Sequence, residues 1–156
     1  VNAPKVYIRD SGLLHALLEI ESMEALRSHP RYGASWEGFA LEQVLARFGD
    51  RDAYFWATQR GAELDLLLIR RGKRWGFEFK CSDAPAMTKS MHLALEDLQL
   101  ERLWAVYPGK DRYAIHKRVD ALPLVDLETA FATVFPETGM DPRETARTRP
   151  RAHREE

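Results

Sequence analysis

Three carboxylates and one lysine in the stretch from Glu63 to Lys80 have the types and spacing of a metal-assisted hydrolytic site. Asp65 interrupts a run of leucines, and Glu78 precedes Lys80 by two positions in an aromatic segment. Carboxylate oxygens are the ligands that Mg²⁺ prefers, and Mg²⁺ takes one or two of them while it keeps several waters. A lysine beside such a metal can hold an attacking water or offset charge in the transition state. The chemistry that this combination would serve is phosphodiester hydrolysis.

Two strands joined by a tight turn are predicted to carry these residues. The run 64–69 is almost unbroken in apolar residues, which is typical of a strand buried on both faces. The segment 71–73 has a central glycine, which suits a turn because glycine adopts positive φ without strain. The segment 75–80 alternates aromatic residues with small or charged ones, as expected for a strand with two different faces.

Strand alternation predicts where the charged side chains point. Glu78 and Lys80 lie two positions apart and therefore share a face, and the same rule places Glu63 with Asp65 on the neighbouring strand. If these faces coincide, three carboxylates and one ammonium meet inside an otherwise apolar sheet. Charges are expensive to bury unless they are paired or bind a metal. The pattern therefore indicates a functional pocket.

A helix from Trp36 to Phe48 is predicted to pack on this sheet, because its apolar residues recur every three or four positions. Ser35 is expected to cap its N-terminus, and Gly49 to end it. Glu37 and Glu42 lie on or beside the flanks of the apolar stripe. A glutamate from this helix would help to place a metal or its waters.

The remaining elements complete an alternating pattern of helices and strands. We expect a strand at 6–8, helices at 13–20 and from 22 to about 29, a strand at 54–56, a helix at 87–100, a strand at 103–107, edge strands at 113–116 and 122–125, and a last helix ending at 135. The core order helix, strand, strand, strand, helix, strand, after an N-terminal helical lead, predicts an α/β (α+β) sandwich with a mixed central sheet. We expect one domain at 1–135 and a disordered tail at 136–156.

Composition sets broad limits on function. The chain has 156 residues, of which 45% are apolar and 30% charged, as in ordinary soluble proteins. Its formal net charge of −1 gives no global basic field, so nucleic-acid binding requires a local patch. Cys81 is the single cysteine, which excludes an internal disulfide and favours a cytoplasmic location. We expect no membrane partner, and a start at Val1 instead of Met predicts a fragment of something longer.

Asp65 followed by Glu78-Phe79-Lys80, on that order of elements, resembles the signature of the PD-(D/E)xK nuclease superfamily, which has a restriction-endonuclease-like fold. The resemblance implies that Asp65 and Glu78 bind Mg²⁺ or Mn²⁺ and that Lys80 is the catalytic lysine.

The same resemblance implies a glutamate on the packing helix, which some members of the superfamily have. Glu37 is the first candidate for this fourth catalytic residue, and Glu42 is the competing one. Glu63 is an additional acid that the signature does not require.

A narrower resemblance covers roughly residues 4–130. The segments 4–13, 32–39, 55–65 and 78–82 look like the domain of unknown function 4143 that is found at the C-terminus of many prokaryotic AAA-type ATPases. The resemblance implies an upstream P-loop ATPase domain as a partner, and ATP would bind there, because this chain has no Gly-x-x-x-x-Gly-Lys-Ser/Thr motif.

Two functions from different classes follow. The first is Mg²⁺-dependent hydrolysis or binding of DNA by the nuclease-like domain of an ATPase. The second is a non-catalytic module that docks nucleic acid, a partner protein or a sister subunit in a homo-oligomer.

Basic residues near the predicted turn leave a further alternative open. Arg70, Arg71, Lys73 and Arg74 form either a solvated loop, which we favour, or a patch that contacts phosphates. Lys89, close after the predicted site, is the better candidate for a contact with a nucleic-acid backbone.

Overall fold

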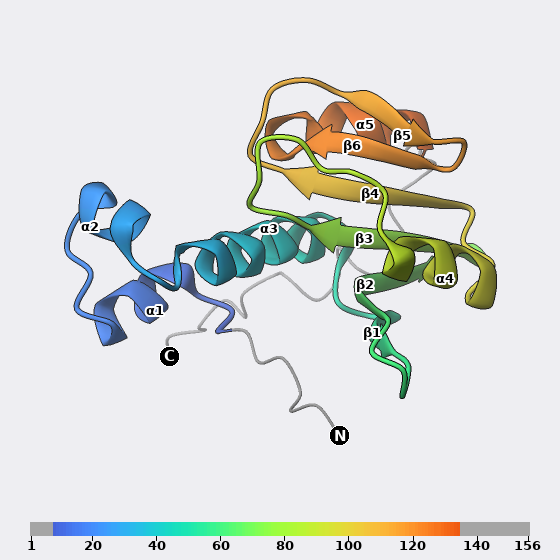
Figure 1. The fold of residues 1–156 in the computed structure, drawn as a ribbon. Coiled ribbons are helices and arrows are strands. Elements are labelled where there is room, and N and C mark those ends of the chain that lie inside the picture. The colour runs from blue at the N-terminus through green and yellow to red at the C-terminus, as the bar shows by residue number, and fades with distance from the viewer. Residues whose placement is uncertain (1–7, 135–156) are drawn as a thin grey trace, which may run out of the picture.

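The computed structural model describes residues 8–134, in which helices cover both faces of a six-stranded mixed sheet (Figure 1). The elements are α1 (Ser11–Leu17), α2 (Met23–Ser28), α3 (Tyr32–Phe48), β1 (Ala53–Ala57), β2 (Glu63–Arg70), β3 (Lys73–Phe79), α4 (Lys89–Asp97), β4 (Arg102–Tyr107), β5 (Tyr113–His116), β6 (Val119–Pro123), the 3-10 turn η1 (Leu124–Asp126) and α5 (Leu127–Val134). The predicted order of a helix, three strands, a helix and a strand is found from α3 to β4. The predicted mixed α/β class is therefore confirmed.

The sheet combines an antiparallel half with a parallel half. Its strand order is β1-β2-β3-β4-β6-β5. The pairs β1–β2 and β2–β3 are antiparallel, whereas the pairs β3–β4 and β4–β6 are parallel. β5 pairs antiparallel with β6 and forms the far edge. The predicted edge strand at 122–125 is wrong, because β6 is Val119–Pro123 and lies between β4 and β5. The acidic Asp120 hid this strand, since it interrupts the apolar pattern of a fully buried segment.

Two apolar clusters fix the helices to the sheet. One face of the sheet packs against α3 and α5 around Trp104 and Phe131. The other face packs against α4 around Met91 and Leu95, whereas α1 and α2 extend beyond the sheet at the N-terminal end of α3 (Figure 1). Gly76 of β3 makes a close approach possible there, because a Cβ at this position would lie 2.6 Å from a methyl carbon of Leu100.

The helix ends are partly as predicted, and Gly49 ends α3 as expected. The Asp10 carboxylate accepts a hydrogen bond from the backbone N of Leu13 at 2.9 Å, which caps α1. The expectation that Ser35 caps α3 is wrong, because α3 already begins at Tyr32 and Ser35 lies buried within it. Its hydroxyl is instead 2.7 Å from Nε2 of His15, which links α1 to α3.

The start of α4 differs from the prediction. Helix α4 starts at Lys89, two residues later than predicted, because the Thr88 hydroxyl caps it by accepting a hydrogen bond from the backbone N of Met91 at 3.2 Å. The predicted strand at 6–8 and the tail at 136–156 lie largely or wholly outside the described residues, and Ile8 is not in a strand. No helix within residues 8–134 is long and apolar enough to cross a membrane.

Candidate functional site

Strand β2 contains a β-bulge at 65–66. Along β1, Tyr54 pairs with Leu67, whereas Trp56 pairs with Leu64, so the register shifts between these two pairs. Two residues of β2 therefore lie opposite one residue of β1. Bulges of this kind redirect side chains and are frequent beside active sites.

The bulge interrupts the alternation of side chains along β2 at Asp65. Strict alternation fails here, because Leu64 and Leu67 pack in the same cluster under α4 although they are three positions apart. The Oδ2 atom of Asp65 accepts a hydrogen bond from the backbone N of Phe79 at 3.0 Å. Asp65 is 7% exposed, and its carboxylate thus joins β2 to β3 beyond the last regular pair of their ladder. This bond places the Asp65 carboxylate directly beside the Glu78–Lys80 segment.

Glu78 and Lys80 form an ion pair at the end of β3. Glu78 is 3% exposed, and its Oε2 atom lies 3.0 Å from Nζ of Lys80. Phe77 and Phe79 pack beneath α3 and α5, so alternation directs Glu78 toward the face that α4 covers. The side chain of Lys80 is 38% exposed, and Lys80 therefore connects a buried carboxylate to solvent.

Three carboxylates act on Lys80. Desolvation by partial burial lowers the pKa of Lys80, but the charge of Glu78 and the hydrogen bond to it raise this pKa. The charges of Asp65 and Glu37 raise it further, and the net pKa lies above the ordinary value. The structure thus brings all four predicted site residues into one electrostatic neighbourhood and keeps Lys80 as an ammonium at neutral pH.

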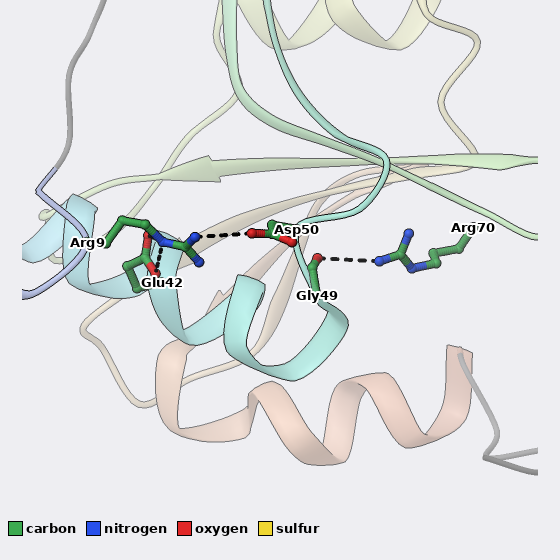
Figure 2. Close-up of polar contacts among 5 residues, drawn as sticks. All are labelled: Arg9, Glu42, Gly49, Asp50 and Arg70. Atoms are coloured by element: carbon green, nitrogen blue, oxygen red, sulfur yellow. Dashed lines mark hydrogen bonds and ion pairs between the residues drawn. The ribbon is translucent and has the colours of Figure 1, made fainter. Parts of the chain in front are cut away.

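The two candidate glutamates of α3 have different surroundings. Burial raises the pKa of the Cys81 thiol, and the charge of Glu37 raises it further, which places Glu37 near the end of β3. Glu42 instead accepts hydrogen bonds from Nε of Arg9 at 3.1 and 3.2 Å, and Arg9 also contacts Asp50 at 3.1 Å (Figure 2). Glu42 therefore tethers the N-terminal segment, and Glu37 is the glutamate that accompanies Lys80.

The donor set suits a metal that needs few protein ligands. Within residues 8–134, no group of three His, Cys, Asp or Glu side chains is arranged to hold a metal ion. Asp65 and Glu78 nevertheless offer hard oxygens from neighbouring strands, and Mg²⁺ commonly takes only one or two carboxylates and fills its other positions with water or substrate oxygens. The two carboxylates therefore fit Mg²⁺ or Mn²⁺ but not a closed structural metal site.

Cavities and charges point to different places. A cavity of about 580 Å³ lies between the N-terminal segment and α3. The competing candidate Glu42 lines it, whereas Glu37, Asp65, Glu78 and Lys80 do not. A smaller depression of about 250 Å³ opens beside Asp65, between α3 and β1, and Phe55 forms part of its wall. We place the candidate site at Asp65 because hydrolysis depends on the position of charged groups more than on cavity size.

The basic turn has a structural role. Arg70 donates hydrogen bonds to backbone carbonyls at the C-terminal end of α3, including that of Gly49 at 3.4 Å (Figure 2). Arg74 donates to the carbonyl of Leu98 at the end of α4, at 3.1 Å, and Lys73 pairs with Glu101 at 3.0 Å. Cations at helix C-termini satisfy the free carbonyls and the helix dipole. These contacts favour the local structural role over a phosphate-binding patch, whereas Lys89 is exposed at the first position of α4.

Sequence reasoning missed a third buried carboxylate, beside those of Asp65 and Glu78. Asp120 of β6 is 8% exposed, and its Oδ2 atom lies 2.5 Å from Arg102 of β4 and 3.8 Å from Arg112. The signal that could have revealed it is an acidic residue, Asp120, inside an otherwise apolar run of the sequence. This carboxylate ties β6 to β4, and it lies apart from the four residues predicted to act on substrate.

Comparisons with known proteins agree with the narrower resemblance. The chain is 50% identical over 121 residues to two uncharacterized proteins, Mb2031c of Mycobacterium bovis and Rv2008c of Mycobacterium tuberculosis. The matched region is 78% of this chain but only 27% of each relative, so the chain spans about a quarter of their length. No solved structure matches the chain. The model of a domain of unknown function, DUF4143, matches residues 32–127, which is more than half of the chain, and the chain therefore belongs to the DUF4143 family.

Proposed function

We propose that this DUF4143 domain has a restriction-endonuclease-like core of the PD-(D/E)xK type and hydrolyses phosphodiester bonds in DNA with Mg²⁺ or Mn²⁺. The observation that supports this proposal is the convergence of three carboxylates on one lysine. Glu37 from α3, Asp65 from the bulge of β2 and Glu78 from β3 all raise the pKa of Lys80. The carboxylates of Asp65 and Glu78 supply hard oxygen ligands of the kind that a divalent cation such as Mg²⁺ prefers.

Each residue has a distinct role in this proposal. Asp65 and Glu78 hold the metal, which when bound lowers the pKa of a water and neutralises charge on the phosphate. Lys80 remains protonated and partly exposed, so it orients the attacking water or offsets the charge of the pentavalent transition state. Glu37 accepts hydrogen bonds from waters on the α3 side. The hydrogen bond from Phe79 holds the Asp65 carboxylate in position before substrate binds.

The length of the relatives supports the proposal that this domain is part of a longer protein. Both relatives continue far beyond the matched region, which is 27% of their length. We propose that the complete protein is a cytoplasmic AAA-type ATPase in which ATP binds a separate P-loop domain. ATP hydrolysis would then move or remodel the DNA on which the nuclease-like domain acts.

A specific observation favours a second candidate function. The Glu78 carboxylate contacts Lys80, and the Asp65 carboxylate accepts a backbone hydrogen bond, so both groups already have protein partners. Such a cluster can serve as a structural ion pair. The second candidate is a non-catalytic domain through which the ATPase binds nucleic acid or another protein.

A nicking assay on supercoiled plasmid with Mg²⁺ or Mn²⁺ separates the two candidates. The wild-type chain is expected to nick DNA, and Asp65→Asn is expected to lower the rate about 100-fold or more, since one electrostatic contact at a reacting centre contributes that much. The asparagine side chain keeps an oxygen that can accept the Phe79 hydrogen bond, so the fold is retained. Asp120→Asn is the matched control, because it also removes a buried carboxylate charge. Equal nicking by wild type and Asp65→Asn would leave only the binding role.

A further inference from the structure

The depression of about 250 Å³ between α3 and β1 combines a candidate catalytic acid with exposed aromatic rings, because Asp65 is one of the residues that line it. Its α3 wall is aliphatic and includes Leu41 and Leu45. Its β1 wall is aromatic and consists of Tyr54 and Phe55, which are each 50% exposed. Phenylalanine is among the residue types that are most often buried in soluble proteins. An accessible apolar surface therefore lies directly beside the group that is proposed to act on DNA.

We infer that this depression takes an unpaired base of single-stranded DNA, which stacks on Phe55 beside the Asp65 carboxylate. The inference rests on the proposed function, because it names the form of DNA that the same site takes. Aromatic side chains stack on unpaired bases with little regard to sequence, since every base has a π-face. A base within a duplex is already stacked on its neighbours and must be unstacked before it can enter a pocket, whereas a base in a single strand is exempt from most of that energy cost.

The register of β1 and β2 places Phe55 next to the candidate site. The shift between Tyr54 and Trp56 leaves Phe55 opposite the bulge at 65–66. The hydrogen bond from the backbone N of Phe79, at 3.0 Å, holds the Asp65 carboxylate at this point of the sheet. A nucleotide whose base lies on Phe55 would therefore have its sugar and phosphates close to the carboxylate that is proposed to hold the metal.

Arginines accompany the acidic residues at the rim of the depression. Asp50 lines the depression and contacts Arg9 at 3.1 Å (Figure 2). Asp52 lies 3.9 Å from Arg70, and Arg51, which stands between the two aspartates in the chain, is exposed. Because phosphate groups are bound mainly by arginine and lysine, Arg51 is the residue of this rim that would contact the backbone of the bound strand.

Fluorescence anisotropy of a labelled single strand and of its duplex, in the presence of Ca²⁺, tests the inference. The wild-type chain is expected to bind the single strand at least about fivefold more tightly than the duplex, which is the lower end of the contribution of one stacked base. Phe55→Leu keeps the apolar volume but removes the aromatic face, so it should weaken single-strand binding at least about fivefold. Tyr54→Leu, in the same wall, is a second variant with the same expected direction. Phe39→Leu is the matched control, because Phe39 is 42% exposed and lines the larger cavity instead. Circular dichroism verifies that each variant folds.

The outcomes separate this inference from the proposed function. A wild-type chain that does not bind the single strand, or that binds the duplex equally well, would overturn the inference, and so would unchanged single-strand binding in both Phe55→Leu and Tyr54→Leu. If nicking depends on Asp65 while single-strand binding does not depend on Phe55, the nuclease stands and the stacking pocket is wrong. Binding that depends on Phe55 without any nicking would support the pocket and reject hydrolysis. Negative supercoiling favours local strand separation, so nicking of supercoiled plasmid is compatible with a preference for single strands.

Discussion

Two buried carboxylates in this sheet, Glu78 and Asp120, each contact a partly exposed cation, but their surroundings differ. Asp120 lies 2.5 Å from Arg102 and 3.8 Å from Arg112, so two cations accompany one acid. Glu78 lies 3.0 Å from Lys80, and that one lysine is also influenced by Asp65 and Glu37. Asp120 therefore links two strands through arginines, whereas Glu78 belongs to a group of acids around one lysine.

The largest expected effect is on metal-dependent stability. Because a ligand that binds only the folded state raises its stability, millimolar Mn²⁺ should raise the melting temperature of the wild-type chain. Asp65→Asn or Glu78→Gln should abolish this increase, whereas Asp120→Asn should retain it. Thermal denaturation with and without Mn²⁺ makes the measurement. If Mn²⁺ still raised the melting temperature of Asp65→Asn, the surroundings of Glu78 and Asp120 would not differ in metal binding.

The next effect concerns the fold itself. Asp120→Ala leaves Arg102 without its carboxylate and loosens β6 from β4, which we expect to cost about 2 kcal/mol, less than for fully buried pairs because both arginines reach solvent. Asp65→Asn keeps an acceptor for the Phe79 amide and should cost less than about 1 kcal/mol. Urea denaturation of the metal-free variants compares them. If Asp65→Asn lowered the free energy of unfolding more than Asp120→Ala did, the structural role would belong to Asp65.

A smaller effect follows from the raised pKa of Lys80. A raised pKa in the folded state means that protonated Lys80 stabilises the fold below the ordinary value of 10.5, and that this contribution is lost as the pH rises through the folded-state pKa. The stability difference between wild type and Lys80→Met should therefore be constant from neutral pH to near 10 and then change above 10.5 in the direction that disfavours wild type. Denaturation at several pH values tests this. A difference that disappeared near neutral pH would contradict the assignment.

The smallest effect distinguishes the two glutamates of α3. The charge of Glu37 contributes to the raised pKa of Cys81, so Glu37→Gln should lower that pKa and speed alkylation of the thiol by a few-fold at about pH 8. Glu42→Gln is the control and should leave the rate unchanged, because Glu42 contacts Arg9 instead. The rate of reaction with iodoacetamide provides the measurement. Equal acceleration by both substitutions would show that Glu37 has no special proximity to the end of β3.

Local patterns predicted most of the fold. The apolar spacing of α3 and the glycine turn between β2 and β3 were sufficient to place both elements, because each depends on residues close in sequence. The bulge at 65–66 could not be predicted, since leucines on both sides of Asp65 carry no information about which face each one occupies. The start of α3 was missed because Arg31 provides no side-chain cap hydrogen bond.

The sequence was sufficient to predict which residue types form the candidate site. It was less informative about how their side chains are positioned relative to one another. The spacing of Glu78 and Lys80 sufficed for their contact, because both lie on one strand. The hydrogen bond from Phe79 to Asp65, and the contact of Asp120 with Arg102, depend on how separate strands align. Such alignments arise from packing of the whole sheet, and no local pattern encodes them.

Gly76 has a consequence for the variation that this domain can tolerate. Because a methyl carbon of Leu100 occupies the space in which a side chain at position 76 would begin, even alanine would require the buried Leu100 side chain to move. Glu78 lies two positions further along the same strand. A side chain larger than alanine at position 76 is therefore expected to disturb the packing between β3 and the segment after α4, close to the Glu78 carboxylate.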